Sequence, residues 1–181
     1  DREYLILNND QNIKEENFRY YQKLITKRSF REPIAYLTNK KNFWNYKFLV
    51  TKDTLIPRPD TEVVVEQILK ITKFKTKMKI LDIGVGSGCI LLTILKERKN
   101  FYGVGVDISK KCLNISKINA KNLRVSSRVK FFKTDVDKFT QGKYDLIISN
   151  PPYIKKLKLK YLEKDVVNFE PKLALNGGLD L

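Results

Sequence analysis

The stretch Ile80-Leu-Asp-Ile-Gly-Val-Gly-Ser-Gly88 decides the fold, because it joins a short apolar run to a glycine-rich turn. A helical pattern follows from about Cys89 to Lys96, so the segment is predicted to form a strand, a tight loop and a helix. Glycine backbone can approach a ligand closely, and a helix N-terminus favours negative charge. The turn is therefore a candidate binding loop at the carboxyl end of a strand.

Three further apolar runs continue the same alternation, at Val104–Val106, Val129–Phe132 and Leu146–Ile148. Ser109 is placed to cap a helix that ends at about Asn122. Strands separated by helices of this length predict βαβ units, and therefore an α/β protein with a Rossmann-like, mostly parallel sheet. Only four parallel strands are accounted for, and an open doubly wound sheet usually has more, so we expect its C-terminal strands to be missing.

Two different regions precede the sheet. Residues 1–31 are polar and helical in pattern, and we expect a partial N-terminal helical region there. Residues 32–60 are rich in aromatic residues and end in a proline-rich segment, which predicts a β-hairpin and a rigid connector. Residues 61–181 then form the α/β domain, whose first helix is expected to be capped by Asp60 or Thr61.

Composition excludes several kinds of site. The chain has 181 residues and no histidine, which rules out Ser-His-Asp catalysis and His-metal clusters. Its two cysteines cannot build a four-cysteine zinc site, so no metal is expected, and they are typical of a reducing compartment. We find no signal peptide and no membrane-spanning run, and we predict a cytoplasmic protein without a membrane partner. The formal charge of +16 favours an acidic partner and leaves contact with nucleic acid open.

The glycine loop does not match the common phosphate-binding patterns. A P-loop needs Lys and Ser or Thr after its last glycine, where this chain has Cys89 and Ile90. The dinucleotide pattern needs glycine at position 89 or 91, and neither position has one. Instead, Asp82 lies two residues before Gly84, and its carboxylate suits a cationic ligand better than a pyrophosphate.

Two more acids follow the next two strands. Asp107 ends the second strand, where a carboxylate can accept hydrogen bonds from a ribose diol, and Asp135 ends the third, where it can meet an adenine amino group. S-adenosylmethionine combines a cationic centre, a ribose and an adenine without a phosphate. We therefore predict it as the cofactor.

The fourth strand leads into Asn150-Pro151-Pro152-Tyr153. The two prolines make a rigid bend and remove two N–H donors, which leaves carbonyl groups available. The side-chain oxygen of Asn150 and a proline carbonyl can together accept both hydrogens of one planar –NH₂ group, and Tyr153 can pack against the group that is held. We interpret these four residues as the catalytic motif.

The sequence resembles the HemK/PrmC family of release-factor glutamine methyltransferases, which are class I methyltransferases. The resemblance extends over nearly the whole chain and is most specific in the proline-rich block at residues 54–62. The matching stretches are Arg31-Glu-Pro-Ile-Ala-Tyr-Leu-Thr38, Phe43-Trp44, Thr54-Leu-Ile-Pro-Arg-Pro-Asp-Thr-Glu62, Asn150-Pro-Pro-Tyr153, Phe169-Glu-Pro171 and Gly177-Gly178.

The resemblance implies methylation of the glutamine in the Gly-Gly-Gln tripeptide of class I peptide-chain release factors, in the service of translation termination. It also implies that residues 1–31 are a remnant of the family's substrate-binding helical domain. The implied cofactor-binding residues are Gly84, Val85, Gly86, Ser87, Gly88, Asp107, Asp135 and Val136. The reasoning from the residues adds Asp82 and Asn150 to this set. The implied substrate-binding residues are Asn150, Pro151, Pro152, Tyr153, Arg58 and Glu62.

Two alternatives stay open at this point. The same Asn-Pro-Pro-Tyr geometry would serve a methyltransferase acting on adenine N6 or on tRNA, and the positive charge would favour phosphate contacts. The other alternative is a S-adenosylmethionine-binding module without catalytic activity.

Overall fold

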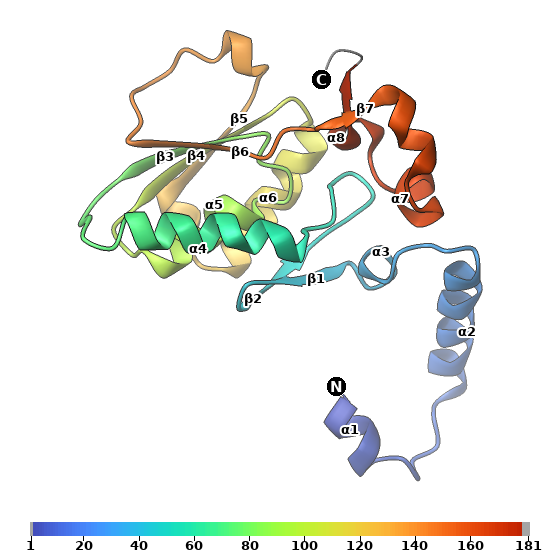
Figure 1. Ribbon diagram of the computed structural model, residues 1–181. Helices are drawn as coiled ribbons and strands as arrows, with labels where there is room; N and C mark the ends of the chain where they lie inside the picture. Colours follow the sequence, from blue (N-terminus) through green and yellow to red (C-terminus); the bar gives the residue numbers. More distant parts are fainter. Residues whose placement is uncertain (1, 179–181) are drawn as a thin grey trace.

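The computed structural model describes residues 2–178, and its centre is a four-stranded parallel sheet (Figure 1). The strand order is β5-β4-β3-β6, which confirms the four predicted strands and their parallel direction. The strands are β3 (Lys79–Ile83), β4 (Tyr102–Asp107), β5 (Val129–Lys133) and β6 (Leu146–Ser149).

Three helices pack on one face of this sheet: α4 (Glu62–Ile71), α5 (Cys89–Glu97) and α6 (Lys110–Asn122) (Figure 1). Leu91, Leu92, Ile94 and Leu95 make α5 almost wholly apolar, and all four are completely buried in the main core. Removal of these side chains from water supplies much of the stability of this layer. The predicted cap of α6 is confirmed, because the backbone N–H of Cys112 donates to the Ser109 hydroxyl.

Thr61 occupies the N-cap position of α4, as predicted, but the expected side-chain capping bond is not formed. Residues Pro59–Thr61 form a short 3₁₀ turn, η1, that continues directly into the helix. Neither Asp60 nor Thr61 makes a side-chain capping bond to α4. The proline at the start of η1 already fixes a helical φ there, so the turn begins without a capping side chain.

The opposite face of the sheet is covered differently. Leu81, Val104 and Val106 are buried there against Phe139 and Tyr144, which come from the segment between β5 and β6. The segment contains a 3₁₀ turn, η3 (Val136–Lys138), and no α-helix. No α-helix of the described residues belongs to the apolar cluster on this face.

The N-terminal region consists of helices α1 (Arg2–Leu7), α2 (Glu15–Ser29) and α3 (Ile34–Thr38), followed by the hairpin β1 (Lys40–Phe43) and β2 (Tyr46–Leu49). The predicted hairpin is therefore confirmed. Helix α2 has no buried residue, and Phe18, Tyr21 and Ile25 are exposed on it. Figure 1 shows α1 and α2 extending away from the sheet, which explains why their apolar side chains find no core.

Hydrogen bonds attach the hairpin to the helical layer. Both the indole N–H of Trp44 and the hydroxyl of Tyr46 donate to the Glu97 carboxylate at the end of α5, at 3.0 and 2.8 Å. The backbone N–H of Trp44 donates to Glu62 at the start of α4, at 2.8 Å. The turn of the hairpin is therefore fixed at two points of the α/β domain.

The C-terminal part forms a small second unit around β7 (Ile154–Lys155) and β8 (Asn176–Gly178), a parallel pair that the sequence did not predict. Between them lie η4 (Lys156–Tyr161), α7 (Lys164–Phe169) and α8 (Lys172–Leu175). Phe169 packs on a separate buried cluster of Tyr36, Val50 and Ile56, which joins this unit to the hairpin region. Within residues 2–178, no helix has the length and apolar character needed to cross a membrane.

Candidate functional site

The glycine loop connects β3 to α5 and has the backbone conformation that its composition predicts. Gly84, Gly86 and Gly88 all have positive φ angles, of 73°, 56° and 81°. A Cβ atom built on Gly84 would meet nothing within 4 Å, so the loop has open space beside it at this point. A Cβ on Gly88 would lie 2.7 Å from Leu92 Cδ1, so this glycine is required for packing against α5. The loop therefore combines an open face for a ligand with a closely packed back.

Asp82 lies on β3 just before the loop and is only 2% exposed. Burial raises the pKa of its carboxyl group to about 7, and the neighbouring Asp107 carboxylate adds to this effect. Near neutral pH the group is therefore poised between its neutral and ionised forms. A bound cation would favour the ionised form, so Asp82 fits the expected cationic ligand.

Asp107, at the end of β4, is hydrogen-bonded to the loop itself. Its two carboxylate oxygens accept the backbone N–H of Gly86, at 3.0 Å, and of Ser109, at 2.8 Å. The sequence predicted only a ligand-binding role for this residue, and the structure shows that it also orders the glycine loop. A carboxylate has further lone pairs, so the same group can still accept a ribose hydroxyl.

Asp135 and Val136 follow β5 and are both exposed. The Asp135 side chain accepts the backbone N–H of Asp137 and thereby begins η3. The structure thus places the three predicted acids at the carboxyl end of three neighbouring strands, β3, β4 and β5.

The Asn-Pro-Pro-Tyr motif lies directly beside the glycine loop. In the parallel pairing of β3 with β6, Ile83 is opposite Ser149, so Gly84 and Asn150 follow at adjacent strand ends. The Ser149 hydroxyl donates to the carbonyl of Ile83 at 3.1 Å and ties the two ends together. Tyr153 is 72% exposed, so its ring is available to a partner.

A cleft of about 420 Å³ opens at this motif, and it contains Asn150, Pro151, Tyr153 and, from the proline-rich segment, Arg58. These are four of the predicted substrate-binding residues. The other residues that line the cleft are Leu55, Asp60, Thr61, Val64, Ser149, Ile154, Leu162, Val166, Ala174 and Leu175.

Glu62 was also expected to bind the substrate, but it is not among the residues that line the cleft. Its carboxylate accepts the backbone N–H of Trp44 in the hairpin. Glu62 is the first residue of α4, and the structure therefore gives it a contact with the hairpin rather than with the cleft.

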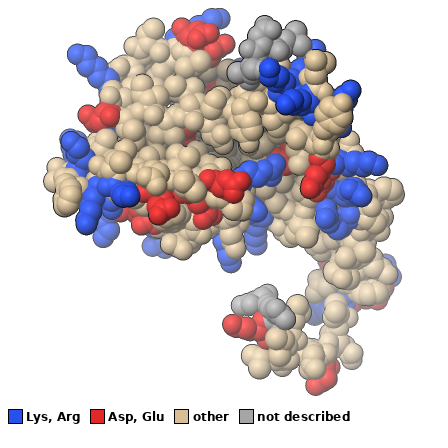
Figure 2. Space-filling model, in the orientation of Figure 1, with Lys and Arg blue, Asp and Glu red and all other residues tan. Residues whose placement is uncertain are grey.

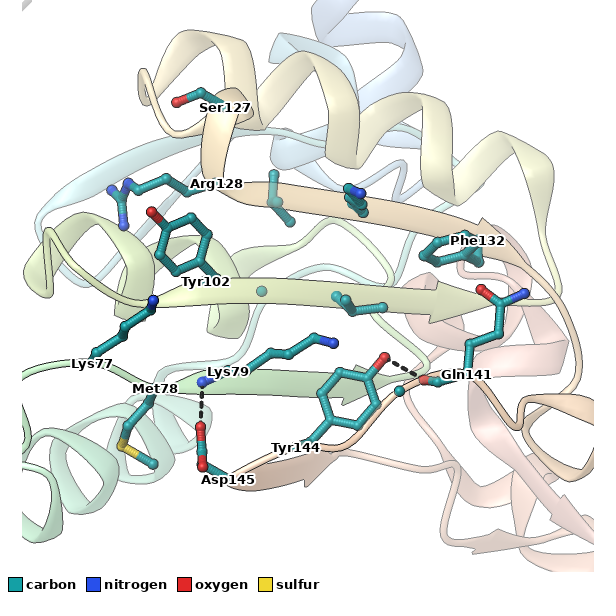
Figure 3. A pocket seen from close by; sticks show the side chains of 15 residues that line it. Lys77, Met78, Lys79, Tyr102, Ser127, Arg128, Phe132, Gln141, Tyr144 and Asp145 are labelled. Carbon is teal, nitrogen blue, oxygen red and sulfur yellow. Dashed lines mark hydrogen bonds between the residues drawn. The ribbon is translucent and has the colours of Figure 1, made fainter.

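A larger cavity, of about 640 Å³, lies elsewhere (Figure 3). It includes the amino ends of β3 and β4, and its lining includes Lys77, Tyr102, Tyr144 and Asp145. Ligands of open α/β sheets bind outside the carboxyl ends of the strands, and none of the predicted site residues lines this cavity. We therefore assign the candidate site to the cleft at the Asn-Pro-Pro-Tyr motif, although the other cavity has the larger volume.

Glu170 supports the wall of the cleft, and the sequence predicted no role of its own for it. Its side chain is 2% exposed and forms an ion pair with Arg58, while its second oxygen accepts the backbone N–H of Ile56 at 3.3 Å. Glu170 therefore holds both the guanidinium and the backbone of the cleft wall. The two residues are 112 positions apart, and only the Phe-Glu-Pro stretch pointed to this region.

The two cysteines have no features of nucleophiles. Burial raises the pKa of the Cys89 thiol to about 12 and that of Cys112 to about 11. Both thiols are therefore protonated at neutral pH. No group of three or more Cys, Asp or Glu side chains that could hold a metal ion occurs within residues 2–178.

Two family descriptions match the chain. Residues 59–177 match the methyltransferase small domain, and residues 1–38 match the PrmC N-terminal domain. The first match covers both the glycine loop and the Asn-Pro-Pro-Tyr motif.

Curated relatives extend the similarity over both regions. The chain is 40% identical to a release factor glutamine methyltransferase of Buchnera aphidicola from Acyrthosiphon pisum, over 98% of this chain and 64% of that protein. It is also 40% identical to the release factor glutamine methyltransferase of Caulobacter vibrioides, over 86% of this chain and 54% of that protein. The chain thus spans between about half and two thirds of the length of these relatives.

Solved structures show the same fold at low identity. The hMettl16 catalytic domain, determined with an RNA hairpin, aligns with a TM-score of 0.59 and 20% identity, over 72% of this chain and 50% of that one. A SAM-dependent methyltransferase from Agrobacterium tumefaciens aligns with a TM-score of 0.53 and 20% identity, over 62% and 39% of the two chains. The Rossmann-like methyltransferase fold predicted from the sequence is confirmed.

Proposed function

The chain belongs to the methyltransferase small domain family and, with its PrmC N-terminal region, to the HemK/PrmC group, and from this we propose that it methylates a glutamine side chain in a protein. The proposed substrate is the glutamine of the Gly-Gly-Gln tripeptide in class I release factors, and the proposed cofactor is S-adenosylmethionine. Relatives that are named release factor glutamine methyltransferases support a release-factor glutamine as the substrate, and a neighbour that is named a SAM-dependent methyltransferase supports the cofactor. The proposed place of action is the cytoplasm.

One observation carries the proposal. The pairing of Ile83 with Ser149 brings the first glycine of the loop and the Asn150 motif to neighbouring strand ends. A methyl donor on the loop and an amide held by the motif would therefore meet at one edge of the sheet. The cleft at that edge also contains Arg58 and the ring of Tyr153, which can contact a peptide that carries the amide.

The residues assigned to the cofactor fit a cationic nucleoside without phosphate. We assign the open loop from Gly84 to Gly88, together with Asp82, Asp107, Asp135 and Val136, to its binding. When bound, S-adenosylmethionine supplies a methyl group on a positively charged sulfur. Asp82 is buried and can ionise next to that charge, and the loop has space in front of Gly84.

The chemical task of the protein is to present a poor nucleophile. An amide nitrogen shares its lone pair with the carbonyl group, so it attacks slowly. Asn150 and the Pro151 carbonyl would accept the two N–H hydrogens, fix the direction of the nitrogen and favour a localised lone pair. This is catalysis by orientation and preorganised electrostatics, and it needs no histidine base. The proton can leave to water after the transfer.

The domain assignment is also part of this proposal. Residues 1–31 would belong to a helical substrate-binding domain, residues 32–60 to the hairpin and proline-rich connector, and residues 61–181 to the methyltransferase domain. Residues 1 and 179–181 lie outside the described part of the chain. The exposed apolar side chains of α2 support this division, since a helix that makes no core of its own is suited to a partner surface.

A labelled-methyl transfer assay tests the function. The full chain is incubated with tritiated S-adenosylmethionine and, in parallel, with release factor, release factor whose Gly-Gly-Gln glutamine is replaced, tRNA and DNA. We expect label only in the unmodified release factor. Label in tRNA or DNA would instead support the adenine or tRNA alternative, and binding without any transfer would support the non-catalytic module.

The pKa of Asp82 predicts a pH dependence of cofactor affinity. The carboxyl group is neutral below about pH 7 and ionised above it, and the cationic ligand favours the ionised form. We expect affinity to rise about tenfold from pH 6 to pH 8, because the ionised fraction rises by that factor across a pKa of about 7, with release of a proton on binding. Calorimetry in two buffers of different ionisation enthalpy measures both quantities. Asp82→Asn should abolish the pH dependence, and a flat wild-type profile would contradict the assignment.

Four lysines of β7 and η4 predict a role in docking. Lys155, Lys156, Lys158 and Lys160 are exposed, and they lie between the cleft residues Ile154 and Leu162. Figure 2 shows basic side chains gathered over this part of the molecule, where β7 and α7 lie in Figure 1. Neutralising the four lysines with glutamine should raise the apparent KM for release factor and weaken its salt dependence, since surface charge acts on encounter.

The matched control for this experiment replaces four lysines on other surfaces, at positions 47, 70, 96 and 121. That variant loses the same charge and should keep a nearly wild-type KM for release factor. A fall in turnover at saturating substrate with an unaltered KM would show that the four lysines of β7 and η4 act in the chemical step and not in docking.

A further inference from the structure

A buried amide on α6 joins the hairpin to the glycine loop. Asn119 is completely buried, and its side-chain nitrogen donates to the carbonyls of Leu49, at 3.0 Å, and of Ser87, at 2.9 Å. Its side-chain oxygen accepts the backbone N–H of Leu49 at 2.7 Å. One side chain thus satisfies both backbone groups of a hairpin residue and one carbonyl of the candidate cofactor loop.

The hairpin side of this connection leads to the substrate cleft. Leu49 is followed by Val50, which is completely buried in one cluster with Tyr36 and Ile56. Ile56 adjoins Leu55, which lines the cleft, and its backbone N–H donates to Glu170, the partner of Arg58. The wall of the cleft is therefore connected to the glycine loop through Leu49 and Asn119.

A neighbouring side chain makes a similar contact with the loop alone. Ser116 is also completely buried on α6, and its hydroxyl donates to the carbonyl of Gly86 at 2.7 Å. Ser116 and Asn119 therefore hold two successive loop residues, but only Asn119 reaches the hairpin. Replacing Ser116 therefore removes a contact that supports the loop, whereas replacing Asn119 also removes the connection between the loop and the cleft wall.

We propose that Asn119 is a positioning residue that sets the place of the substrate-cleft wall relative to the cofactor loop. This inference rests on the proposed function, because it assumes that the loop and the cleft hold the two reactants. A buried amide whose three hydrogen bonds are all satisfied specifies one arrangement of the segments it joins. A shift of the wall relative to the loop would misplace the amide against the methyl donor, and such misplacement slows group transfer strongly.

Amide hydrogen exchange of the full chain, with and without S-adenosylhomocysteine, tests the connection. In the wild type we expect the ligand to slow exchange in the glycine loop and, by at least about fivefold, at Leu49 and Val50. In Asn119→Ala the ligand should still slow exchange in the glycine loop, but it should slow exchange at Leu49 and Val50 by less than about twofold. Ser116→Ala is the matched control and should keep the hairpin response.

A kinetic readout complements the exchange experiment. At saturating S-adenosylmethionine and release factor, Asn119→Ala should lower kcat by about tenfold. When the cofactor concentration is varied instead, Ser116→Ala should change mainly the KM for the cofactor. If Asn119→Ala does not fold, Asn119→Ser, which can keep one of the three bonds, replaces it in both measurements.

The outcomes separate this inference from the proposed function. No ligand response in the wild-type loop would contradict cofactor binding itself. A loop response without a hairpin response in the wild type would overturn the role of Asn119 and leave the proposed function intact. A hairpin response that persists in the folded Asn119 variant would also overturn it.

Discussion

Replacing Asn150 with alanine is expected to slow methyl transfer by roughly a hundredfold or more at saturating cofactor, comparable with the loss of one preorganised electrostatic contact. The reason is that Asn150 supplies a side-chain acceptor for the amide that must attack. The residue is exposed at the end of β6 and lines the cleft, so its removal should leave the packing of the sheet unchanged. Single-turnover transfer to release factor measures the effect.

The control for Asn150 is another exposed asparagine. Asn122 lies at the end of α6, is exposed and does not line the cleft, so Asn122→Ala should transfer at the wild-type rate. Circular dichroism and calorimetry establish folding and cofactor saturation for both variants. An Asn150→Ala protein that is folded, saturated and nearly as fast as wild type would rule out the orientation mechanism.

Replacing Arg58 with methionine is expected to lower the free energy of unfolding by about 2–3 kcal/mol, or roughly 30- to 150-fold in the equilibrium constant. Glu170 is buried, and within the described residues its carboxylate keeps only the Ile56 N–H as a hydrogen-bond partner once the guanidinium is removed. A buried charge without its counterion is costly. Urea denaturation followed by circular dichroism measures the change.

Two further variants make this test specific. Arg19 pairs with Glu15 on α2, where both side chains are about 70% exposed, so Arg19→Met should change stability by less than about 1 kcal/mol. The double variant Arg58→Met/Glu170→Gln should recover part of the loss, because no buried charge is then left unpaired. Equal effects of Arg58→Met and Arg19→Met would show that the buried pair adds no more to the free energy of unfolding than the exposed pair does.

Local sequence patterns predicted the central sheet well. Each strand is a short and mainly apolar run, and helices with apolar residues at helical spacing follow β3 and β4, so the alternation of the two patterns was sufficient to place β3 to β6. The position of Asp82, Asp107 and Asn150 at one edge follows from parallel direction alone. The same reasoning named four of the residues that line the cleft, among them Arg58 and Asn150, because these lie in motifs.

Contacts between distant segments could not be predicted in this way. Glu62 was expected at the cleft because it ends a motif, but its partner is a backbone N–H in the hairpin. Glu170 and Asn119 contact segments that lie 112 and 70 positions away in the sequence. The residues next to them in the sequence do not indicate which distant segment each one contacts. The pair β7–β8 was missed because β7 has two residues and β8 contains two glycines, so neither has a strand pattern.

The attachment of the hairpin through Trp44 also has an optical consequence. This is the one tryptophan in the sequence, and its indole is half-buried and hydrogen-bonded to Glu97. The intrinsic fluorescence excited at the red edge of the absorption band therefore comes from a single place, the turn between β1 and β2. Detachment of the hairpin from α5 would expose that indole to water and shift its emission to longer wavelength, so the chain contains its own reporter for this one contact.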